Sequence, residues 1–501
     1  MSGHASLLLG LLGTTVAAPS AALTSSPVFV YDFYLSECPP LPQPGCSLSI
    51  SEGCDCDIAD APLRMFRRPG GDGRVFSLAS VDLGSRGFVG ADARSLEHQC
   101  ALYANSTRHA SFGELANYEW VHSSWYFAQN NSAVALTHME WDCKGPETCP
   151  WYGMGYSFFS AVTLFSSPDG GASWGRATPP PAPHVVAVSP IPWTEAIGAA
   201  GQSYGFRSPS SIVAGRGALA GWYYATVTAG WGRGSFRGQL DGACMMRTRD
   251  LTDPASWRAW GGAGFTVPLA ASPYAPGPPP DPAAHTCAPF TNATYLTLAW
   301  SSLFSAYMAF GTAGGNDHGG WAFALSADLE TWGAWAPVGV GAFIAPAGNG
   351  SVVPTGKALA GRFVKREDPR DPSIWYEDEG RTERRSVGSC TPCPGVAACA
   401  NVTLLPDAEF DALAQRPAFS CGVGGLYNAS GWSDFYYPTL VDSDSPSDNF
   451  DEVGATAELF LVGNRCVNAA GDGAGGVRCS PFDVNGLLVR DVLRAGVRVA
   501  A

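Results

Sequence analysis

Eight residues in the first half of the chain constrain its fold more than any other segment. They read Ser167-Pro168-Asp169-Gly170-Gly171-Ala172-Ser173-Trp174 and fit the pattern Ser-x-Asp-x-Gly-x-x-Trp. At this spacing an aspartate accepts hydrogen bonds from turn amides, a glycine supplies a positive φ, and a tryptophan fills the space between neighbouring hairpins. The segment therefore predicts a β-hairpin turn, and by itself it predicts no reaction.

Two later segments, 249–257 and 326–332, repeat this turn in degenerate form. The successive aspartates Asp169, Asp250 and Asp328 are 81 and 78 residues apart. A repeat of this length in strand-type sequence is typical of a propeller blade with loop insertions. Gly and Pro are also abundant, at 60 and 39 residues, as many short strands with many turns require. We predict an all-β, five-bladed β-propeller with few helices, and a six-bladed ring is the alternative.

The repeats divide the chain into four predicted parts. These are a signal peptide at 1–22, a Cys-rich N-terminal extension at 23–74, the propeller at 75–470 and a C-terminal extension at 471–501. Insertions are expected near 270–290 and 343–430, and the second could hide the sixth blade. Within the N-terminal extension, Val28-Phe29-Val30-Tyr31 is a candidate for the strand that closes the ring and removes its exposed edges.

The N-terminus predicts export. Leu7-Leu8-Leu9-Gly10-Leu11-Leu12 is a short apolar core, and Val16-Ala17-Ala18 follows as a small-residue cleavage site, although a disordered apolar leader is the alternative. Six Asn-x-Ser/Thr sequons and 15 cysteines favour an oxidising, extracellular environment and a glycosylated surface. No later run reaches the ~18 apolar residues of a membrane span. We expect a secreted glycoprotein.

The cysteines are interpreted as disulfides rather than zinc ligands. Cys54-x-Cys56 and Cys390-x-x-Cys393 resemble zinc knuckles, but no second knuckle follows either at short spacing. Cys143 with Cys149 and Cys466 with Cys479 would close short loops, and Cys244 with Cys287 would span a long insertion. Because 15 is odd, one cysteine is free or pairs between molecules.

Net charge excludes some partners. The formal charge is −14, whereas nucleic acids and anionic membranes select a cationic face. A glycan or polysaccharide is the expected partner, and we expect a monomer. No P-loop, serine nucleophile elbow or His-Glu-x-x-His motif is present.

The catalytic candidates are carboxylates near predicted innermost strands, because side chains at the start of those strands face a propeller's funnel. Glycoside hydrolysis needs one carboxylic acid and one carboxylate across the scissile bond. Asp82 is the candidate base or nucleophile, and Glu119 and Glu140 are candidate acid/base residues. The alternatives are a turn cap for Asp82 and an ion pair with an arginine for Glu119.

Other polar residues near the same strands are candidates for substrate binding. Ser208-Pro209-Ser210-Ser211-Ile212-Val213 and Tyr437-Pro438-Thr439-Leu440-Val441 are similar elements, each read as the start of an innermost strand. The candidates at and around such positions are Arg86, His122, His138, Arg207, Asp434 and Tyr436. Inter-blade ion pairs and ordinary core histidines are the alternatives.

An acidic loop is the only candidate for a metal site. Its residues Asp442, Asp444 and Asp448 could bind calcium, and a solvated turn is the alternative. The loop lacks the mid-loop glycine of an EF-hand. No cofactor is expected to be required, so any calcium would be structural.

At this point a family resemblance can be stated. The turn at 167–174 and its repeats resemble the Asp-boxes of sialidases, and the Asp-Leu-containing turns resemble those of the arabinofuranosidase, xylosidase and invertase-like propellers. The resemblance covers about 75–465 and implies a glycoside-hydrolase-like propeller.

Some family features differ in this chain. Sialidases carry an Arg-Ile-Pro element near the start of the domain, and the nearest match here is Phe206-Arg207-Ser208-Pro209. The arabinofuranosidase class begins blade one with a catalytic Asp, usually followed by Pro, whereas Asp82 is followed by Leu83. Its acid is a Glu at the start of the third blade, and no Glu adjoins Ser208-Pro209. A secreted glycosidase is therefore the first functional hypothesis, and a non-catalytic carbohydrate-binding or adhesion propeller is the second.

Overall fold

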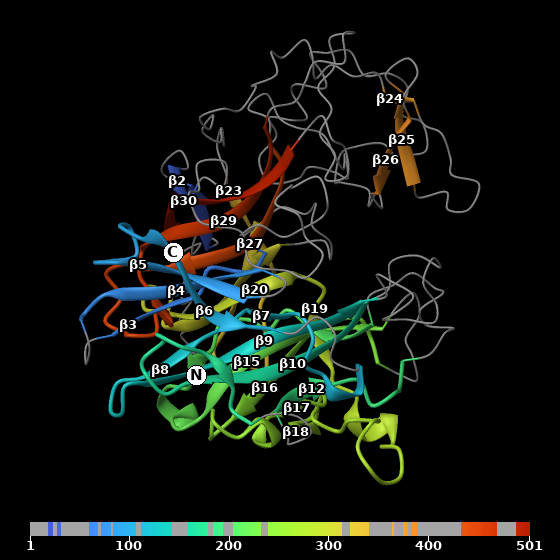
Figure 1. The fold of residues 1–501 in the computed structure, drawn as a ribbon. Helices are drawn as coiled ribbons and strands as arrows, with labels where there is room; N and C mark the ends of the chain where they lie inside the picture. Colours follow the sequence, from blue (N-terminus) through green and yellow to red (C-terminus); the bar gives the residue numbers. More distant parts are fainter. Residues whose placement is uncertain are drawn as a thin grey trace, which may run out of the picture.

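The computed structural model of the 501-residue chain describes a fold that is built almost entirely of strands (Figure 1). The described residues are 19–23, 28–31, 60–68, 72–81, 84–106, 112–142, 158–178, 184–193, 204–231, 239–312, 321–339, 363–364, 374–378, 383–387, 432–467 and 487–500. Their helical segments are short 3₁₀ turns: η3 (Phe112–Glu114), η4 (Gly217–Leu219), η6 (Pro254–Ser256) and η7 (Pro282–His285). Within this part of the chain, no helix is long and apolar enough to cross a membrane.

The first antiparallel meander begins before the predicted blade start. Its strands, in sheet order, are β3 (Met65–Arg67), β4 (Val75–Val81), β5 (Gly84–Gly90) and β6 (Glu97–Asn105). Phe66 pairs with Phe76, so β3 is the inner edge of this sheet. The segment predicted as an N-terminal extension therefore contributes a strand. Three residues are too few to show an alternating pattern in the sequence.

Two further meanders share one sheet. The strands of the first are β7 (Glu119–Val121), β8 (Trp125–Phe127), β9 (Ser132–Asp142), β10 (Phe158–Ser167), β11 (Gly175–Arg176) and β12 (Val185–Val188). Those of the second are β13 (Tyr204–Arg207), β14 (Val213–Ala214), β15 (Tyr223–Trp231), β16 (Gly242–Thr248), β17 (Arg258–Trp260), β18 (Phe265–Pro268) and β19 (Pro289–Thr291). A short parallel pairing of β10 with β13 joins them.

The remaining strands form two more meanders and one small separate sheet. The first meander is β20 (Thr294–Ser301), β21 (Ala306–Thr312), β22 (Trp321–Ser326) and β23 (Ala336–Gly339). The second is β27 (Trp432–Val441), β29 (Thr456–Val467) and β30 (Leu487–Ala500), with β28 (Glu452–Val453) on β20. The small sheet is β24 (Phe363–Val364), β25 (Ile374–Asp378) and β26 (Glu383–Val387).

The two ends of the chain meet on β30. The strands β1 (Ser20–Leu23) and β2 (Val28–Tyr31) both pair antiparallel with β30. The region predicted as a C-terminal extension thus supplies a long strand of the last meander. Its buried Ala495, Val497 and Val499 face the core while Arg498 is exposed, which is the two-residue period of a half-buried strand.

Apolar and aromatic side chains fill the space between meanders. Phe66 of β3 stacks on Tyr126 of β8, with ring centroids 5.3 Å apart, and tilts against Trp174 at 6.3 Å. All three side chains are buried. Successive antiparallel meanders packed in this way, with their first strands facing one cavity, are the arrangement of a β-propeller.

The turn at 167–174 has the geometry that its spacing predicts. The Asp169 carboxylate accepts hydrogen bonds from the Ser173 amide at 2.9 Å and the Ser167 hydroxyl at 2.8 Å. Gly170 and Gly171 have φ of 67° and 95°. Although burial raises it, these bonds hold the pKa of Asp169 below its ordinary value. Trp174 is buried and donates to the Gly171 carbonyl at 3.0 Å.

A loop crosses from the last meander to the others. We call residues 442–454, between β27 and β29, the crossing loop. The loop accepts hydrogen bonds from backbone amides of four strands. Arg67 N of β3 donates to Asp448 O (2.6 Å), and Tyr126 N of β8 donates to Asn449 Oδ1 (2.6 Å). Ala214 N of β14 donates to Asp451 Oδ2 (3.0 Å), and Trp300 N near the end of β20 donates to Asp451 O (2.7 Å). The loop therefore ties the far ends of the innermost strands together.

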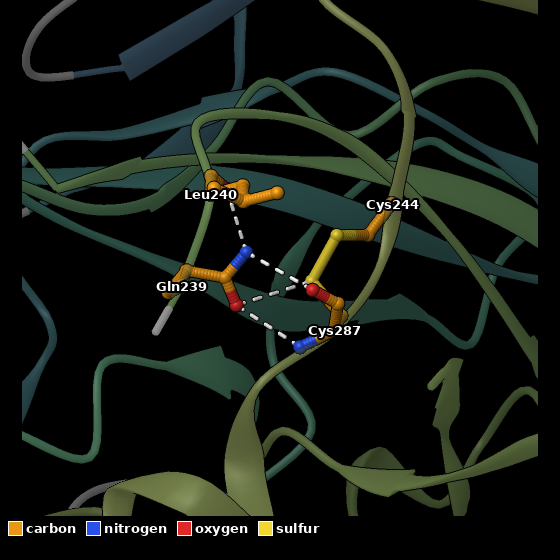
Figure 2. The surroundings of a disulfide bond; sticks show 4 residues. All are labelled: Gln239, Leu240, Cys244 and Cys287. Carbon is orange, nitrogen blue, oxygen red and sulfur yellow. Dashed lines mark hydrogen bonds between the residues drawn. A yellow bond between two sulfur atoms is a disulfide. The ribbon is translucent and has the colours of Figure 1, made fainter. Parts of the chain in front are cut away.

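One predicted disulfide is confirmed. Cys244 of β16 is bonded to Cys287, with Cα atoms 6.1 Å apart and a sequence separation of 43. Figure 2 shows Gln239 beside the bond, where its Oε1 accepts from the Cys287 amide at 2.9 Å and its Nε2 donates to the Leu240 carbonyl at 2.7 Å. The Cys143–Cys149 and Cys466–Cys479 pairs lie outside the side chains that the structure describes.

Removing this disulfide should destabilise the protein substantially. The variant Cys244→Ala/Cys287→Ala releases a loop of 43 residues in the unfolded chain, which in the chain-entropy account costs about 4 kcal/mol. Urea unfolding should show a lower midpoint for the variant than for the wild type, with a steeper slope because the released unfolded chain exposes more surface. An unchanged midpoint would contradict the expectation.

Candidate functional site

A small polar cavity lies where the innermost strands begin. Its volume is about 80 Å³. The lining residues come from separate meanders and are Asp60, Trp120, His138, Glu140, Arg207, Ser208, Tyr295 and Tyr437. Three of them, His138, Glu140 and Arg207, were predicted from the sequence as site residues.

Asp60 enters the cavity just before the first meander. Its Oδ1 accepts a hydrogen bond of 2.9 Å from the Tyr437 hydroxyl, which comes from β27. The Tyr437 ring makes an edge contact with Tyr295 of β20, with centroids 4.6 Å apart. The carboxylate is thus oriented by an aromatic pair that two other meanders supply.

Glu140 and His138 share one face of β9 because they are two residues apart. His138 Nε2 lies 3.3 Å from Glu140 Oε1, and the two side chains are 10% and 21% exposed. Burial, followed by the nearby Arg207, lowers the pKa of His138 to about 3, and Asp60 opposes this only in part. His138 is therefore neutral near pH 7, and the contact joins a neutral imidazole to a carboxylate.

A layer of buried basic side chains lies beneath the cavity. The His122 ring makes edge contacts with His138 at 5.2 Å and Tyr437 at 5.8 Å. Burial, then His138 and Arg64, lowers the pKa of His122 well below its ordinary range. Arg64 donates to Thr297 Oγ1 at 2.5 Å, and burial lowers its pKa to about 9.

Glycine makes room for Arg207. Gly205 has φ +116°, and a Cβ there would lie 2.1 Å from the Ser160 carbonyl oxygen, so no side chain fits. Opposite β13, a Cβ on Gly230 would lie 3.5 Å from Arg207 Nε. These two positions let β13 approach β10 closely and leave space beside the guanidinium.

Three lining residues adopt an unusual backbone conformation. Ser208, Tyr295 and Tyr437 have φ of 47°, 53° and 53°, the left-handed region that side chains with a Cβ rarely occupy. The pairing register of β20 shifts between Thr294 and Thr297, and that of β27 shifts between Tyr436 and Thr439. Strained residues and bulges of this kind gather at functional sites, where they re-aim side chains.

Glu119 lies in a different place from the one its predicted acid/base role requires. It does not line the cavity, and its side chain is fully buried. It forms an ion pair with Arg176, and Thr163 Oγ1 donates to it at 2.7 Å. Burial raises the pKa of Glu119, while Arg176 and Thr163 oppose the shift. The alternative of an arginine ion pair is the arrangement found.

The remaining predicted residues are either absent from the cavity lining or outside the residues that the structure describes. Asp82, between β4 and β5, lies outside the described residues. Arg86 is buried in β5 and donates to the Cys100 carbonyl at 3.0 Å, away from the cavity lining. Asp434 belongs to β27, but its side chain is not described. Tyr436 is half-buried, with its ring 6.1 Å from that of Tyr437.

The three acidic candidates for calcium have protein partners. Asp442 accepts from the Gly454 amide at 2.8 Å, Asp444 pairs with Arg94 at 3.1 Å, and Asp448 faces Arg67 at 4.0 Å. Among the described residues, no group of three or more His, Cys, Asp or Glu side chains is arranged to hold a metal ion. A calcium ion in this loop stays a prediction.

Asp60, Trp120, Tyr295 and Tyr437 were not predicted from the sequence. One signal for Asp60 is present in the sequence. Asp60-Ala61-Pro62 lies shortly before β3 and has a proline close after its aspartate, whereas Asp82 is followed by Leu83. Tyr437 begins the Tyr437-Pro438-Thr439 element and is next to Tyr436, the residue that the sequence predicted. No sequence signal identifies Trp120 or Tyr295 as lining residues rather than core.

Comparisons with known proteins find similar structures only at low sequence identity. No protein-family model and no curated protein matches the sequence. An N-acetylgalactosamine deacetylase from F. plautii is similar in structure, with 10% identity, 94% of this chain and 95% of that chain covered, and a TM-score of 0.40. A thermostable family-43 glycoside hydrolase has 10% identity, coverage of 89% and 93%, and a TM-score of 0.35.

A sialidase from Trypanosoma rangeli is also similar in structure, with 9% identity and a TM-score of 0.34. The match covers 96% of this chain and 60% of the sialidase. Further similar structures are an α-L-arabinofuranosidase, a β-fructofuranosidase and an α-L-arabinanase. The sialidase and the arabinofuranosidase belong to classes that the sequence resemblance named.

Proposed function

We propose that this protein is a secreted, glycoside-hydrolase-like enzyme that acts on an extracellular glycan at the cavity between its innermost strands. The observation that carries the proposal is that two carboxylates from different meanders, Asp60 and Glu140, line one cavity together with Arg207. Paired carboxylates are what hydrolysis of a glycosidic bond requires. The meanders are proposed to be the blades of a five-bladed ring that β1 and β2 close on β30.

The two carboxylates have different surroundings, which suggests different roles. Asp60 is held by the Tyr437 hydroxyl and is the proposed base or nucleophile. Glu140 lies beside the neutral imidazole of His138 and is the proposed acid. Trp120 and Tyr295 line the cavity and are proposed to contact a sugar ring, and Arg207 is proposed to orient its hydroxyl groups.

The proposal predicts a large loss of activity in two variants. Asp60→Asn and Glu140→Gln keep the side-chain shape and remove the acid or base, so sugar release from a glycan panel should fall by about 10²–10⁴-fold in each. The measurement is reducing-sugar release by the purified protein on each glycan, scanned over pH. The matched control is Glu114→Gln, which changes an exposed carboxylate shortly before β7 and should keep full activity.

Each result has a clear meaning. Activity in the wild type and the control, with its loss in both variants, supports the paired-carboxylate enzyme. If Asp60→Asn keeps wild-type activity, the assignment of Asp60 fails. If the wild type releases no sugar but is retained on an immobilised glycan, the protein is a carbohydrate-binding propeller.

A further inference from the structure

A ladder of cations and aromatic rings lies on the meander of β15 and β16, at the strand ends far from the cavity. Arg247 lies over the ring of Phe265 at 4.5 Å and over that of Trp222 at 4.1 Å. Arg249 lies over the same Trp222 ring at 4.3 Å. We call Phe265, Arg247, Trp222 and Arg249 the cation ladder. The ladder ends at the surface, because Arg249 is exposed and Trp222 is half-buried.

Strand pairing explains why these side chains meet. Tyr223 of β15 pairs with Thr248 of β16, and Tyr224 pairs with Arg247. Trp222, which precedes β15, therefore lies opposite Arg249, which follows the last residue of β16. Arg247 and Arg249 are two residues apart and project from the same face of the strand. Cross-strand neighbours on one face are close enough for ring and guanidinium to stack.

The ladder's charge is not neutralised within the described part of the chain. No Asp or Glu there forms an ion pair with Arg247 or Arg249, and Arg247 Nε is buried without a hydrogen-bond partner. Burial raises the pKa of Tyr224 and the neighbouring Arg247 opposes this shift, whereas Glu330, which adds to it, pairs with neither guanidinium.

We propose that the cation ladder binds a polysaccharide that carries anionic groups, either carboxylates or sulfate esters, at a site separate from the cavity. Guanidinium groups bind such planar or multi-oxygen anions through paired hydrogen bonds. The Trp222 ring holds the two guanidinium groups beside each other, because both lie over it. The net negative charge of the molecule repels any polyanion, but this repulsion is screened beyond about 10 Å at 0.1 M salt, whereas the guanidinium contacts act at shorter range.

The ladder is too far from the cavity to belong to it. Arg207 pairs with Thr228, five residues along β15 from Tyr223. At about 3.4 Å per residue the two levels are ~17 Å apart. A chain bound at the ladder would hold the protein on an anionic polymer without occupying the cavity, so the proposal stands whether or not the cavity is catalytic.

Affinity electrophoresis tests the proposal. The wild type should be retarded in gels that contain alginate or dextran sulfate, and it should run freely in neutral dextran. Arg249→Ala and Arg247→Ala/Arg249→Ala should bind roughly ten-fold more weakly, the loss expected for a charge-assisted contact. Arg498→Ala, which removes an exposed arginine on β30, is the matched control and should bind like the wild type.

The outcomes separate the candidate ligands. Retardation by alginate indicates carboxylate recognition, and retardation by dextran sulfate indicates sulfate recognition. Equal retardation of Arg249→Ala and the wild type, or none of the wild type by either polymer, would overturn the proposal. Ladder-dependent retardation by single-stranded DNA alone would also overturn it. Thermal melting of Arg249→Ala should match the wild type, because its side chain is exposed. Asp60→Asn should bind the polymer normally.

Discussion

Replacing Glu119 with alanine is expected to lower the free energy of unfolding by about 3–5 kcal/mol. This is the cost of breaking a buried ion pair by removing one partner, because the other charge is left desolvated. The Glu119 side chain is 0% exposed and that of Arg176 is 17% exposed. Thr163 Oγ1 also loses its acceptor. Urea unfolding followed by tryptophan fluorescence should show the lower stability directly.

A double-mutant cycle distinguishes the ion pair from simple loss of packing. Glu119→Leu and Arg176→Met should each destabilise alone, while Glu119→Leu/Arg176→Met should lose less than the sum of these two single changes, because no unpaired charge remains. Glu114→Ala, on the exposed surface, should stay within about 0.5 kcal/mol of the wild type. A loss below 1 kcal/mol in Glu119→Ala would contradict a buried pair.

Stability should fall as the pH drops below 6.5. The unfolded chain takes up protons on histidine near pH 6.5, whereas burial keeps the pKa of His138 at about 3 and that of His122 well below its ordinary range. The folded state therefore binds fewer protons, and the stability present above pH 6.5 is lost as pH falls, until folded His138 itself titrates near pH 3. Each histidine contributes up to about 1.4 kcal/mol per pH unit in this window.

The measurement is the free energy of unfolding in urea at pH 7, 6 and 5. His138→Gln should reduce the slope of stability against pH by about half. Glu119 has the opposite effect on stability, because its raised pKa means that the folded state gains stability as the carboxylate becomes protonated at lower pH. The wild type and His138→Gln both contain Glu119, so their slopes are compared under the same conditions. Identical slopes in the variant and the wild type would show that His138 is not buried in its neutral form.

The sequence predicted features that depend on nearby residues. Asp169 binds Ser167 and Ser173, so the whole turn can be recognised from eight letters. The Cys244–Cys287 pair could be proposed because few partners were available across that insertion. The strand content followed from many short β-type segments between glycines and prolines.

The site could be predicted only in part, because its contacts join distant segments. Asp60 is oriented by Tyr437, which is 377 residues away, and no local pattern reveals that contact. The positive φ of Tyr437 is also invisible in sequence, since tyrosine rarely adopts it. Glu119 and Glu140 are both acidic residues among aromatic neighbours, so only the structure separates the buried pair from the cavity-lining carboxylate.

The crossing loop sets the order in which this protein can be completed. Its bonds join Arg67, Tyr126 and Ala214 to residues 378, 323 and 237 positions later in the chain. Synthesis at about 5–20 residues per second leaves the first meander waiting for tens of seconds before these partners emerge. Contacts of such long range also form slowly. Until residue 454 has been made, the nascent chain lacks these contacts, and exposed strand edges in such incomplete states favour aggregation.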